Sequence, residues 1–481
     1  MIKFIDLFAG TGGIRLGFEQ ACKKHEIETE CVYSSEIDKN ACKSYELNFG
    51  HNPYSDITKV DTLPSFDFML AGFPCQSFSY AGKQRGFGDT RGTLFFDVER
   101  LLKKYKPKGF ILENVRGLTT HDKGRTFKTI INSLEAIGYN VEYRLMNTSN
   151  FNVPQNRVRI YIVGVLEQPF QIKLNSDTGA IDSHNFKSRN GQQSLFETIV
   201  SNKVISDILE PNPDKKYYCS KEFTKQLKSV IGKDLSKLNG YRLIDTRNGN
   251  SLHSWELGIK GKCNKDEINF MNLLIANRRK KIFGTHQDGK ALTQEQIETF
   301  YKKDNFKEVT ELLLKKGYLS NYDNKYNPVC GNMSFEVFKF LDPNSISITL
   351  TASDTNRLGI VQNGKARRLT TRECARLQGF PESYKLLEND NAVYKQMGNA
   401  VSVPVIEALT NDLLENNKGI LERKANAKSH THLQFAEATT QAKIAKEYAF
   451  ANASKFAEKN NESTTTYIKN SGLSALSKVN T

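Results

Sequence analysis

The first 165 residues alternate short apolar, β-rich runs with amphipathic stretches, and this alternation restricts the fold more than any other feature. The amphipathic stretches keep helical spacing, as at Leu94, Val98 and Leu101, whereas the apolar runs are typical of buried strands. Strands that alternate with helices form a parallel sheet covered on both faces. The sequence therefore predicts an α/β, Rossmann-like fold with a mostly parallel sheet. The predicted strands are 2–8, 31–35, 66–71, 109–113, 141–146 and 158–164.

The rest of the sequence falls into three parts. From about 170 to 345 it is polar and rich in Lys and Asn, which predicts a second domain with a small core and a helical stretch near 292–317. Residues 366–417 end in an apolar helix from Val401, in which Pro404 is tolerated only in the first turn. Beyond about 420 the chain is polar, and we expect it to be partly helical or disordered.

Composition narrows the class of partner. The formal charge of +15 and the pI of about 9.2 favour a polyanionic partner, although a solvated basic surface would give the same balance. The eight cysteines are scattered without a CxxC pair, which predicts reduced thiols and no metal site. The sequence shows neither a signal-peptide pattern nor an apolar run of membrane-span length, so we expect a soluble cytoplasmic protein.

Residues 71–79 (AGFPCQSFS) place a cysteine at a turn directly after a predicted strand. Gly72 and Pro74 redirect the backbone, which leaves Cys75 in a loop at the carboxyl end of that strand. Ligands and catalytic groups collect at this edge of an open α/β sheet. Cys75 is therefore a candidate nucleophile, although a free cysteine is more often a small buried apolar side chain.

Residues 4–13 (FIDLFAGTGG) predict a strand, a glycine-rich turn and a helix that begins near Ile14. Such a turn lets a ligand approach the backbone at a helix N-terminus. Glu36, after the next strand, can hold a ribose hydroxyl pair, and Asp56 can accept a hydrogen bond from an adenine amino group. A tight turn and two exposed carboxylates are the alternative, but together the three features favour a cofactor that contains adenosine.

Two further segments bring charged side chains to the same edge. Glu113 ends a predicted strand and can supply a proton or a hydrogen bond to a reacting ring. In the segment QNRVR, alternation puts Arg157 and Arg159 on one face of a strand, where paired guanidinium groups suit a phosphate or a polarised carbonyl. Each arginine alone would be ordinary for a protein surface.

Eight motifs occur in a fixed order along roughly 1–165 and 345–417. They are FAGTGG, SSEID, DIT, GFPCQSFS, ENV, QNRVRIYIVG, RRLTTRECARLQGFP and QMGNAV. In these motifs the chain resembles bacterial cytosine-5 DNA methyltransferases, the modification enzymes of restriction–modification systems. The resemblance implies an S-adenosylmethionine-dependent methyltransferase fold with a smaller, mixed target-recognition domain. It also implies sequence-specific methylation at C5 of a flipped-out cytosine in duplex DNA.

The resemblance implies a role for each catalytic residue. Cys75 would add to C6 of the cytosine, which makes C5 nucleophilic enough to accept a methyl group. Glu113 would bond to N3 and the exocyclic amine, and Arg159, with Arg157, would hold O2 and a neighbouring phosphate. The other residues implied to bind the substrate are Gln76, Ser79 and Thr349.

For the cofactor, S-adenosylmethionine without a metal, the resemblance places Glu36 at the ribose and Asp56 at the adenine. Close relatives often carry tryptophan directly after the ribose-binding acid. This chain has Ile37 there, so we expect an aliphatic contact with the adenine. The remaining residues implied to form this pocket are Phe8, Gly10, Gly12, Leu94 and Asn399.

The resemblance also assigns the parts of the chain. We expect the loop 77–91 to close over the DNA as a lid, and Arg278 and Arg279 of the basic run 278–281 to contact phosphate rather than bases. The expected parts are a catalytic and cofactor-binding domain at 1–165, a target-recognition domain with a helical insert at 170–350, a return segment with a C-terminal helix at 351–418 and a polar tail at 420–481.

The expected partners are double-stranded DNA and a cognate restriction endonuclease that acts on the same site. We expect no membrane contact and a monomer in the bacterial cytoplasm, associated with the nucleoid while it acts. Two alternatives are a cytosine-5 methyltransferase of RNA, whose relatives have a small variable domain, and a DNA-binding regulator that has lost its catalytic groups. An amino-group methyltransferase is disfavoured, because Asn52-Pro53-Tyr54 holds one proline where the loop of that class needs two.

Overall fold

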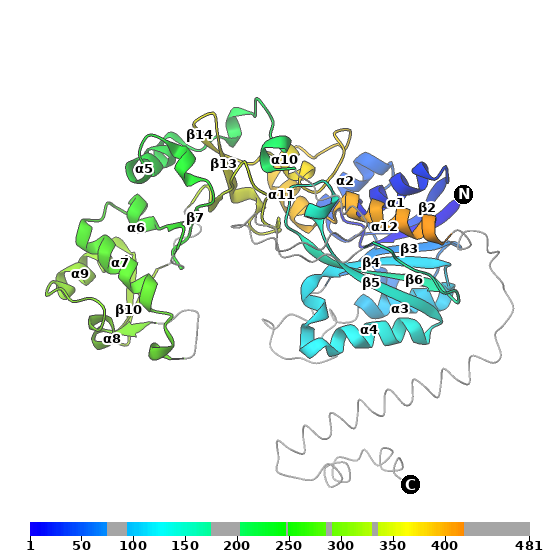
Figure 1. The fold of residues 1–481 in the computed structure, drawn as a ribbon, viewed down its shortest axis with the longest axis horizontal. Helices are drawn as coiled ribbons and strands as arrows, with labels where there is room; N and C mark the ends of the chain where they lie inside the picture. Colours follow the sequence, from blue (N-terminus) through cyan, green and yellow to red (C-terminus); the bar gives the residue numbers. More distant parts are fainter. Residues whose placement is uncertain (75–93, 175–202, 247–248, 285–290, 330–334, 418–481) are drawn as a thin grey trace, which may run out of the picture.

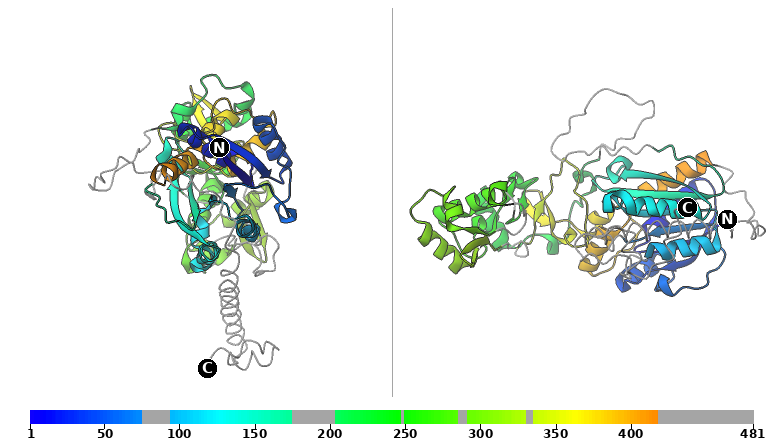
Figure 2. Two further views of the ribbon diagram at one scale, coloured as in Figure 1. Left: turned by 90° about the vertical axis from the view of Figure 1, so that its right-hand side faces the viewer. Right: turned by 90° about the horizontal axis from the view of Figure 1, so that it is seen from below.

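Three units follow one another across the molecule in the computed structural model (Figure 1). A large α/β unit holds both ends of the described chain, a middle unit is built on a second sheet, and a distal lobe lies farthest from the large unit. Figure 2 shows the same order of units when the molecule is seen from below. The structure describes residues 1–74, 94–174, 203–246, 249–284, 291–329 and 335–417.

A six-stranded sheet forms the large unit, in the order β2-β1-β3-β4-β6-β5. Strands β1 to β4 are parallel, whereas β6 runs antiparallel to both of its neighbours. The predicted mostly parallel sheet is confirmed, with one reversal at β6. Only residues 148–157, which begin with a 3-10 turn, join β5 to β6, and this connection is too short for a parallel crossover. The strands are β1 (Ile2–Leu7), β2 (Thr29–Ser35), β3 (Phe68–Gly72), β4 (Gly109–Val115), β5 (Tyr139–Asn147) and β6 (Val158–Leu166).

Alternate side chains of these strands enter two separate cores, one on each face of the sheet. Ile5 and Met69 pack beneath α3 (Leu94–Tyr105) and α4 (Arg125–Ala136) on one face. Phe4 and Leu70 pack beneath α1 (Gly13–Lys24) and α12 (Val403–Asn416) on the other face. Helix α2 (Lys39–Phe49) follows the edge strand β2. The two-sided covering that the alternating sequence predicts is therefore confirmed.

The last described helix, α12, packs closely on the first, α1, because Gly17 has no side chain. A Cβ atom on Gly17 would lie 2.6 Å from the carbonyl oxygen of Val403 and 2.7 Å from Cβ of Ile406. Pro404 lies in the first turn of α12, as predicted, where its missing N–H leaves no helical hydrogen bond unmade. The C-terminal helix thereby completes the fold that the N-terminal strands begin.

A five-stranded sheet with the order β14-β13-β12-β7-β8 forms the middle unit. One of its faces packs on α5, and the other packs on α10 and α11. Strands β13 and β14 follow residue 350, so the sheet contains segments from both sides of the expected domain boundary. The elements are α5 (Lys221–Ile231), β7 (Arg242–Leu243), β8 (Ser251–Leu252), β12 (Lys339–Phe340), β13 (Leu358–Gln362), β14 (Lys365–Arg368), α10 (Thr371–Arg376) and α11 (Asp390–Asn399).

The distal lobe has its own core, in which Trp255, Phe270 and Leu313 are buried. The predicted helical stretch near 292–317 is confirmed as two helices, at 294–298 and 306–316. Its first residues form a strand, and Thr293 then caps a short new helix by accepting from the Gln296 N–H. The elements are α6 (Ser254–Leu257), α7 (Lys265–Asn277), β9 (Leu292–Thr293), α8 (Gln294–Glu298), α9 (Phe306–Lys316), β10 (Leu319–Tyr322) and β11 (Lys325–Pro328).

The expectation that Arg278 and Arg279 contact phosphate is wrong for Arg278. Arg278 caps the C-terminus of α7 and is only 2 % exposed, so its guanidinium is enclosed by the lobe. Lys280 and Lys281 are exposed. None of the helices in the described ranges is long and apolar enough to cross a membrane.

A buried acid in β1 makes the stability of the large unit depend on pH. The carboxyl group of Asp6 accepts a hydrogen bond from the Tyr45 hydroxyl at 3.1 Å, and burial raises its pKa to about 8 despite the nearby Arg15. The pKa of an aspartate in the unfolded chain is about 3.9, so the folded state holds an extra proton between these two values. The free energy of unfolding therefore falls as pH rises through this window.

We expect Asp6→Asn to flatten this dependence, because the amide cannot ionise. The melting temperature of the variant, relative to that of the unmodified protein, should rise steadily from about pH 5 to about pH 8. Thermal unfolding across this range measures the effect. A constant difference between the two proteins would contradict the protonated state of Asp6.

Candidate active site

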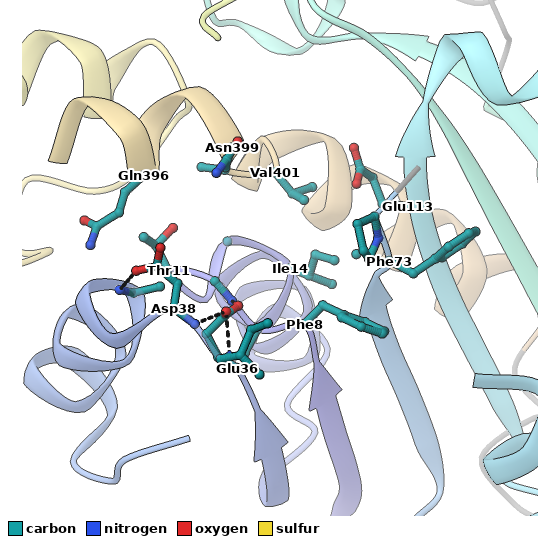
Figure 3. A pocket seen from close by; sticks show the side chains of 18 of the residues that line it. Phe8, Thr11, Ile14, Glu36, Asp38, Phe73, Glu113, Gln396, Asn399 and Val401 are labelled. Carbon is teal, nitrogen blue, oxygen red and sulfur yellow. Dashed lines mark hydrogen bonds between the residues drawn. The ribbon is translucent and has the colours of Figure 1, made fainter. Parts of the chain in front are cut away.

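A cavity of about 860 Å³ opens at the carboxyl ends of β1, β3 and β4. This volume lies within the range of sites for small organic ligands, which is roughly 300–1,000 Å³. Figure 3 shows Phe8, Glu36 and Glu113 on the sheet side of the cavity, with Gln396 and Asn399 opposite. The large unit and helix α11 thus form one site between them.

The glycine-rich turn after β1 forms the floor of the cavity. Gly10 and Gly12 have φ angles of 53° and 77°, in the left-handed region that favours glycine, and Gly12 is the N-cap of α1. Phe8 also has a positive φ angle, 53°, which is unusual for an aromatic residue. Such backbone outliers cluster at ligand sites. Phe8 and Gly10 line the cavity, whereas Gly12, which the resemblance also assigns to this pocket, is not among its lining residues.

Three backbone N–H groups fix the carboxylate of Glu36 at the cavity wall. One oxygen accepts from Gly10 at 2.9 Å, and the other accepts from Ile37 and Asp38, each at 2.7 Å. The glycine-rich turn and the acidic residue that the sequence predicts as cofactor ligands are therefore in direct contact. This contact orients the carboxylate before any ligand arrives.

The other residues predicted to surround the adenine also lie on the cavity wall. Leu94 is partly buried, whereas Ile37 is 68 % exposed. Asp56 accepts hydrogen bonds from the side chain and the N–H of Thr58, and these bonds lower the pKa of its carboxyl group. Asn399 is the last residue of α11 and is exposed at the cavity.

Three buried polar atoms of the cavity wall have no partner within the described residues. They are the hydroxyl oxygen of Thr11, the amide nitrogen of Gln396 and the Nε atom of Arg157. Because buried polar groups are normally hydrogen-bonded, such atoms indicate a polar ligand. Thr11 and Gln396 are not predicted from the sequence, although each belongs to a motif and Gln396 lies three residues before Asn399 on the same helix.

These features fit S-adenosylmethionine. The apolar wall suits an adenine ring, Glu36 suits the ribose hydroxyls, and the unpaired atoms of Thr11 and Gln396 suit the polar amino-acid end. No group of His, Cys, Asp and Glu side chains in the described ranges could hold a metal ion.

At the far end of the cavity, Glu113 forms a buried ion pair with Arg159. The Nε atom of Arg159 lies 3.2 Å from a carboxylate oxygen of Glu113, and both side chains are at most 15 % exposed. Burial raises the pKa of Glu113, while the charges of Arg159 and Arg157 oppose the increase. The site therefore holds a carboxyl group that keeps its proton to a higher pH than a solvated one, so a proton is present there to be donated.

Arg157 does not lie on a strand, contrary to the prediction, because β6 begins one residue later at Val158. Its guanidinium is buried and donates to three backbone carbonyls, those of Leu350, Gly398 and Ala400, at 2.8 to 3.2 Å. The pKa of Arg157 is lowered to about 9. Burial is the larger cause, and the nearby charge of Arg159 is the second. Arg157 thus stays charged at neutral pH and joins β6 to the end of α11.

The neighbouring residues of the QNR segment make similar contacts. The side chain of Gln155 accepts from the Leu350 N–H at 2.9 Å and donates to the Leu377 carbonyl at 2.5 Å. Thr349 donates to the carbonyl oxygen of Asn156, so its hydroxyl contacts backbone within the protein. Thr349 also lines a smaller cavity of about 330 Å³ beside Arg116.

The loop that carries the candidate nucleophile begins at a buried contact. The side chain of Asn114, next to Glu113, donates to the Phe73 carbonyl at 2.9 Å. Pro74, the following residue, lines the cavity. Cys75, Gln76, Ser79, the expected lid 77–91 and the tail 420–481 lie outside the described residues.

Comparison with known proteins identifies the family to which this site belongs. Residues 2–415 match C-5 cytosine-specific DNA methylase as a family. The chain belongs to this family. It is 64 % identical over 416 residues to the Type II methyltransferase M.BanI of Aneurinibacillus aneurinilyticus. This match covers 86 % of this chain and 96 % of that relative. The Type II methyltransferase M.HgiCI of Herpetosiphon aurantiacus is 60 % identical over 418 residues, or 86 % of this chain and 98 % of that one.

Solved structures agree on the fold of this DNA methylase. The Dnmt2 methyltransferase of S. pombe has a TM-score of 0.50 and 18 % sequence identity, and covers 86 % of this chain and 99 % of its own. The methyltransferase EhMeth of Entamoeba histolytica has a TM-score of 0.50 and 16 % identity, with 86 % and 98 % covered. The predicted family and fold class are therefore confirmed.

The two arginines should differ in their contribution to stability. Arg157→Met removes the guanidinium that donates to three backbone carbonyls, and these carbonyls stay buried without a donor. We therefore expect the free energy of unfolding to fall by about 3 kcal/mol or more. Arg159→Met leaves Glu113, which burial already favours in its neutral form, so a loss of about 1 kcal/mol is expected. Denaturant unfolding measures both, and equal losses would contradict the clamp formed by Arg157.

Proposed function

We propose that this DNA methylase transfers a methyl group from S-adenosylmethionine to C5 of a cytosine that is flipped out of duplex DNA. The arrangement that supports this best is the buried Glu113–Arg159 pair at the end of a cofactor-sized cavity, beside the strand end that leads into Cys75. A flipped base that enters the cavity would meet a proton donor and a cation at once.

The thiolate of Cys75 forms a bond to C6, while Glu113 gives a proton to N3 and so accepts the negative charge that enters the ring. Arg159 bonds to O2 and keeps Glu113 in place. C5 then takes up the methyl group that bound S-adenosylmethionine supplies. Loss of the C5 proton to solvent restores the double bond, expels the thiolate and returns the N3 proton to Glu113.

Glu36, Thr11 and Gln396 bind the cofactor in this proposal, with Phe8, Leu94 and the other wall residues around its base. We further propose that the chain modifies DNA in a restriction–modification system, since its relatives M.BanI and M.HgiCI are named Type II methyltransferases. A cognate endonuclease would act on the same site, and the methylase would act as a monomer.

Glu36→Gln should weaken the binding of S-adenosylmethionine by about ten- to a hundred-fold, because a charge-assisted hydrogen bond is worth roughly 1.5–3 kcal/mol. Asp56→Asn is the control, since its carboxylate is partly exposed and we expect a smaller loss. Titration calorimetry with S-adenosylmethionine measures both without DNA. If Glu36→Gln bound as tightly as the unmodified protein, the ribose assignment would be wrong.

Cys75→Ser should abolish methyl transfer to DNA while the affinity for S-adenosylmethionine stays nearly unchanged. Cys219→Ser is the matched control, because burial raises the pKa of the Cys219 thiol to about 12 and keeps it unreactive. A target duplex with fluorine at C5 of the cytosine should form a denaturation-resistant adduct with the unmodified protein, since fluorine cannot leave as the proton does.

The same assay separates the alternatives. Radiolabelled methyl groups should appear in duplex DNA and not in transfer RNA. Label in RNA alone would overturn the DNA proposal, and an adduct with Cys75→Ser would show that another residue is the nucleophile. Absence of transfer to either nucleic acid would favour a non-catalytic DNA-binding protein.

A further inference from the structure

Two cationic side chains face each other in the sheet of the middle unit. Lys339 on β12 is the direct register partner of Arg242 on the antiparallel strand β7. Directly opposed residues project from the same face of a sheet, with Cβ atoms roughly 4.5–5.5 Å apart. In the part of the chain that the structure describes, neither side chain forms an ion pair or a hydrogen bond, although most other arginines there do.

This arrangement is unfavourable for the protein alone. Lys339 is only 7 % exposed. Its burial lowers the pKa of the ammonium group to about 8, and the charge of Arg242 is the second cause of this decrease. Like charges placed directly opposite each other destabilise a sheet, and a buried cation without a partner costs more still. A bound anion would reverse both costs.

The pair lies on the face of the sheet on which α10 and α11 pack. Lys339 is also the register partner of Leu358, so it shares a face with that residue. Leu358 packs in the cluster formed with α10 and α11, and α11 carries one wall of the cofactor cavity. Helix α5 covers the opposite face. Figure 1 places β7 between the large unit and the distal lobe.

We propose that Lys339 and Arg242 form a phosphate clamp for the backbone of duplex DNA. The clamp rests on the proposed function, because it needs a duplex that lies across the middle unit while its cytosine enters the cavity. A phosphodiester offers a compact anion to the ammonium group and two oxygens to the guanidinium. Such a contact fixes the position of the duplex without reading its sequence.

The salt dependence of DNA binding tests this clamp in the full chain. A fluorescent duplex is titrated with the unmodified protein, Lys339→Met and Arg242→Met between about 50 and about 200 mM salt. Each variant should make the slope of log K against log salt shallower by about 0.9 for each phosphate that the variant no longer neutralises. Affinity should fall by the same factor for a target duplex and for an unrelated one.

Lys225→Met is the matched control, because it removes an exposed lysine from α5, the helix on the opposite face of the sheet. Its slope should equal that of the unmodified protein. The melting temperature of Lys339→Met should be at least as high as that of the unmodified protein, because the variant removes repulsion. A merely structural lysine would lower it.

An unchanged slope in both clamp variants, or a fall in affinity that follows a loss of fold, would overturn the proposal. Methyl transfer by the unmodified protein is measured separately. If the unmodified protein methylated no DNA while Lys339→Met and Arg242→Met still had shallower salt slopes, the phosphate clamp would be supported and the proposed reaction would be wrong.

Discussion

One buried guanidinium holds the two halves of the active site together. The chain leaves the large sheet after β6 and returns only after the middle unit and the distal lobe have been formed. At the point of return, Arg157 donates to the carbonyl of Leu350 and to two carbonyls at the end of α11. Gln155 accepts from the N–H of the same Leu350 and donates to the carbonyl of Leu377. Backbone carbonyls that would otherwise be buried without donors are thus satisfied by two side chains of the same short segment.

This junction also controls the electrostatics of the site. Arg157 directs its charge toward carbonyl dipoles, whereas Arg159, two residues later, directs its charge toward Glu113. The same short segment therefore supplies a structural cation and a cation that faces the reacting ring. The burial of Glu113 raises the pKa of its carboxyl group, while the charges of Arg159 and Arg157 lower it, so packing and acid–base chemistry are coupled at one strand end.

Much of the large unit could be predicted because buried parallel strands have continuous apolar sequences. All six strands of its sheet occur where those apolar runs lie. The reversed direction of β6 could not, since an apolar run carries no direction. Arg157 looked like a ligand for phosphate because backbone carbonyls, its true partners, leave no trace in a sequence. The burial of Arg278 likewise depends on distant packing in the distal lobe. Motif residues such as Glu36 were found, but the unpaired atoms of Thr11 and Gln396 appear only once the cavity exists.

The separate core of the distal lobe has a consequence for how this protein can change. Trp255, Phe270 and Leu313 pack with one another and belong to no cluster of the large unit. A segment with its own core forms its own cooperative unit of opening and closing, and hydrogen exchange inside it need not follow exchange in the catalytic sheet. Substitutions, insertions and deletions there are absorbed locally. Evolution can therefore reshape the distal lobe while the cofactor cavity, Glu113 and the Arg157 contacts stay as they are.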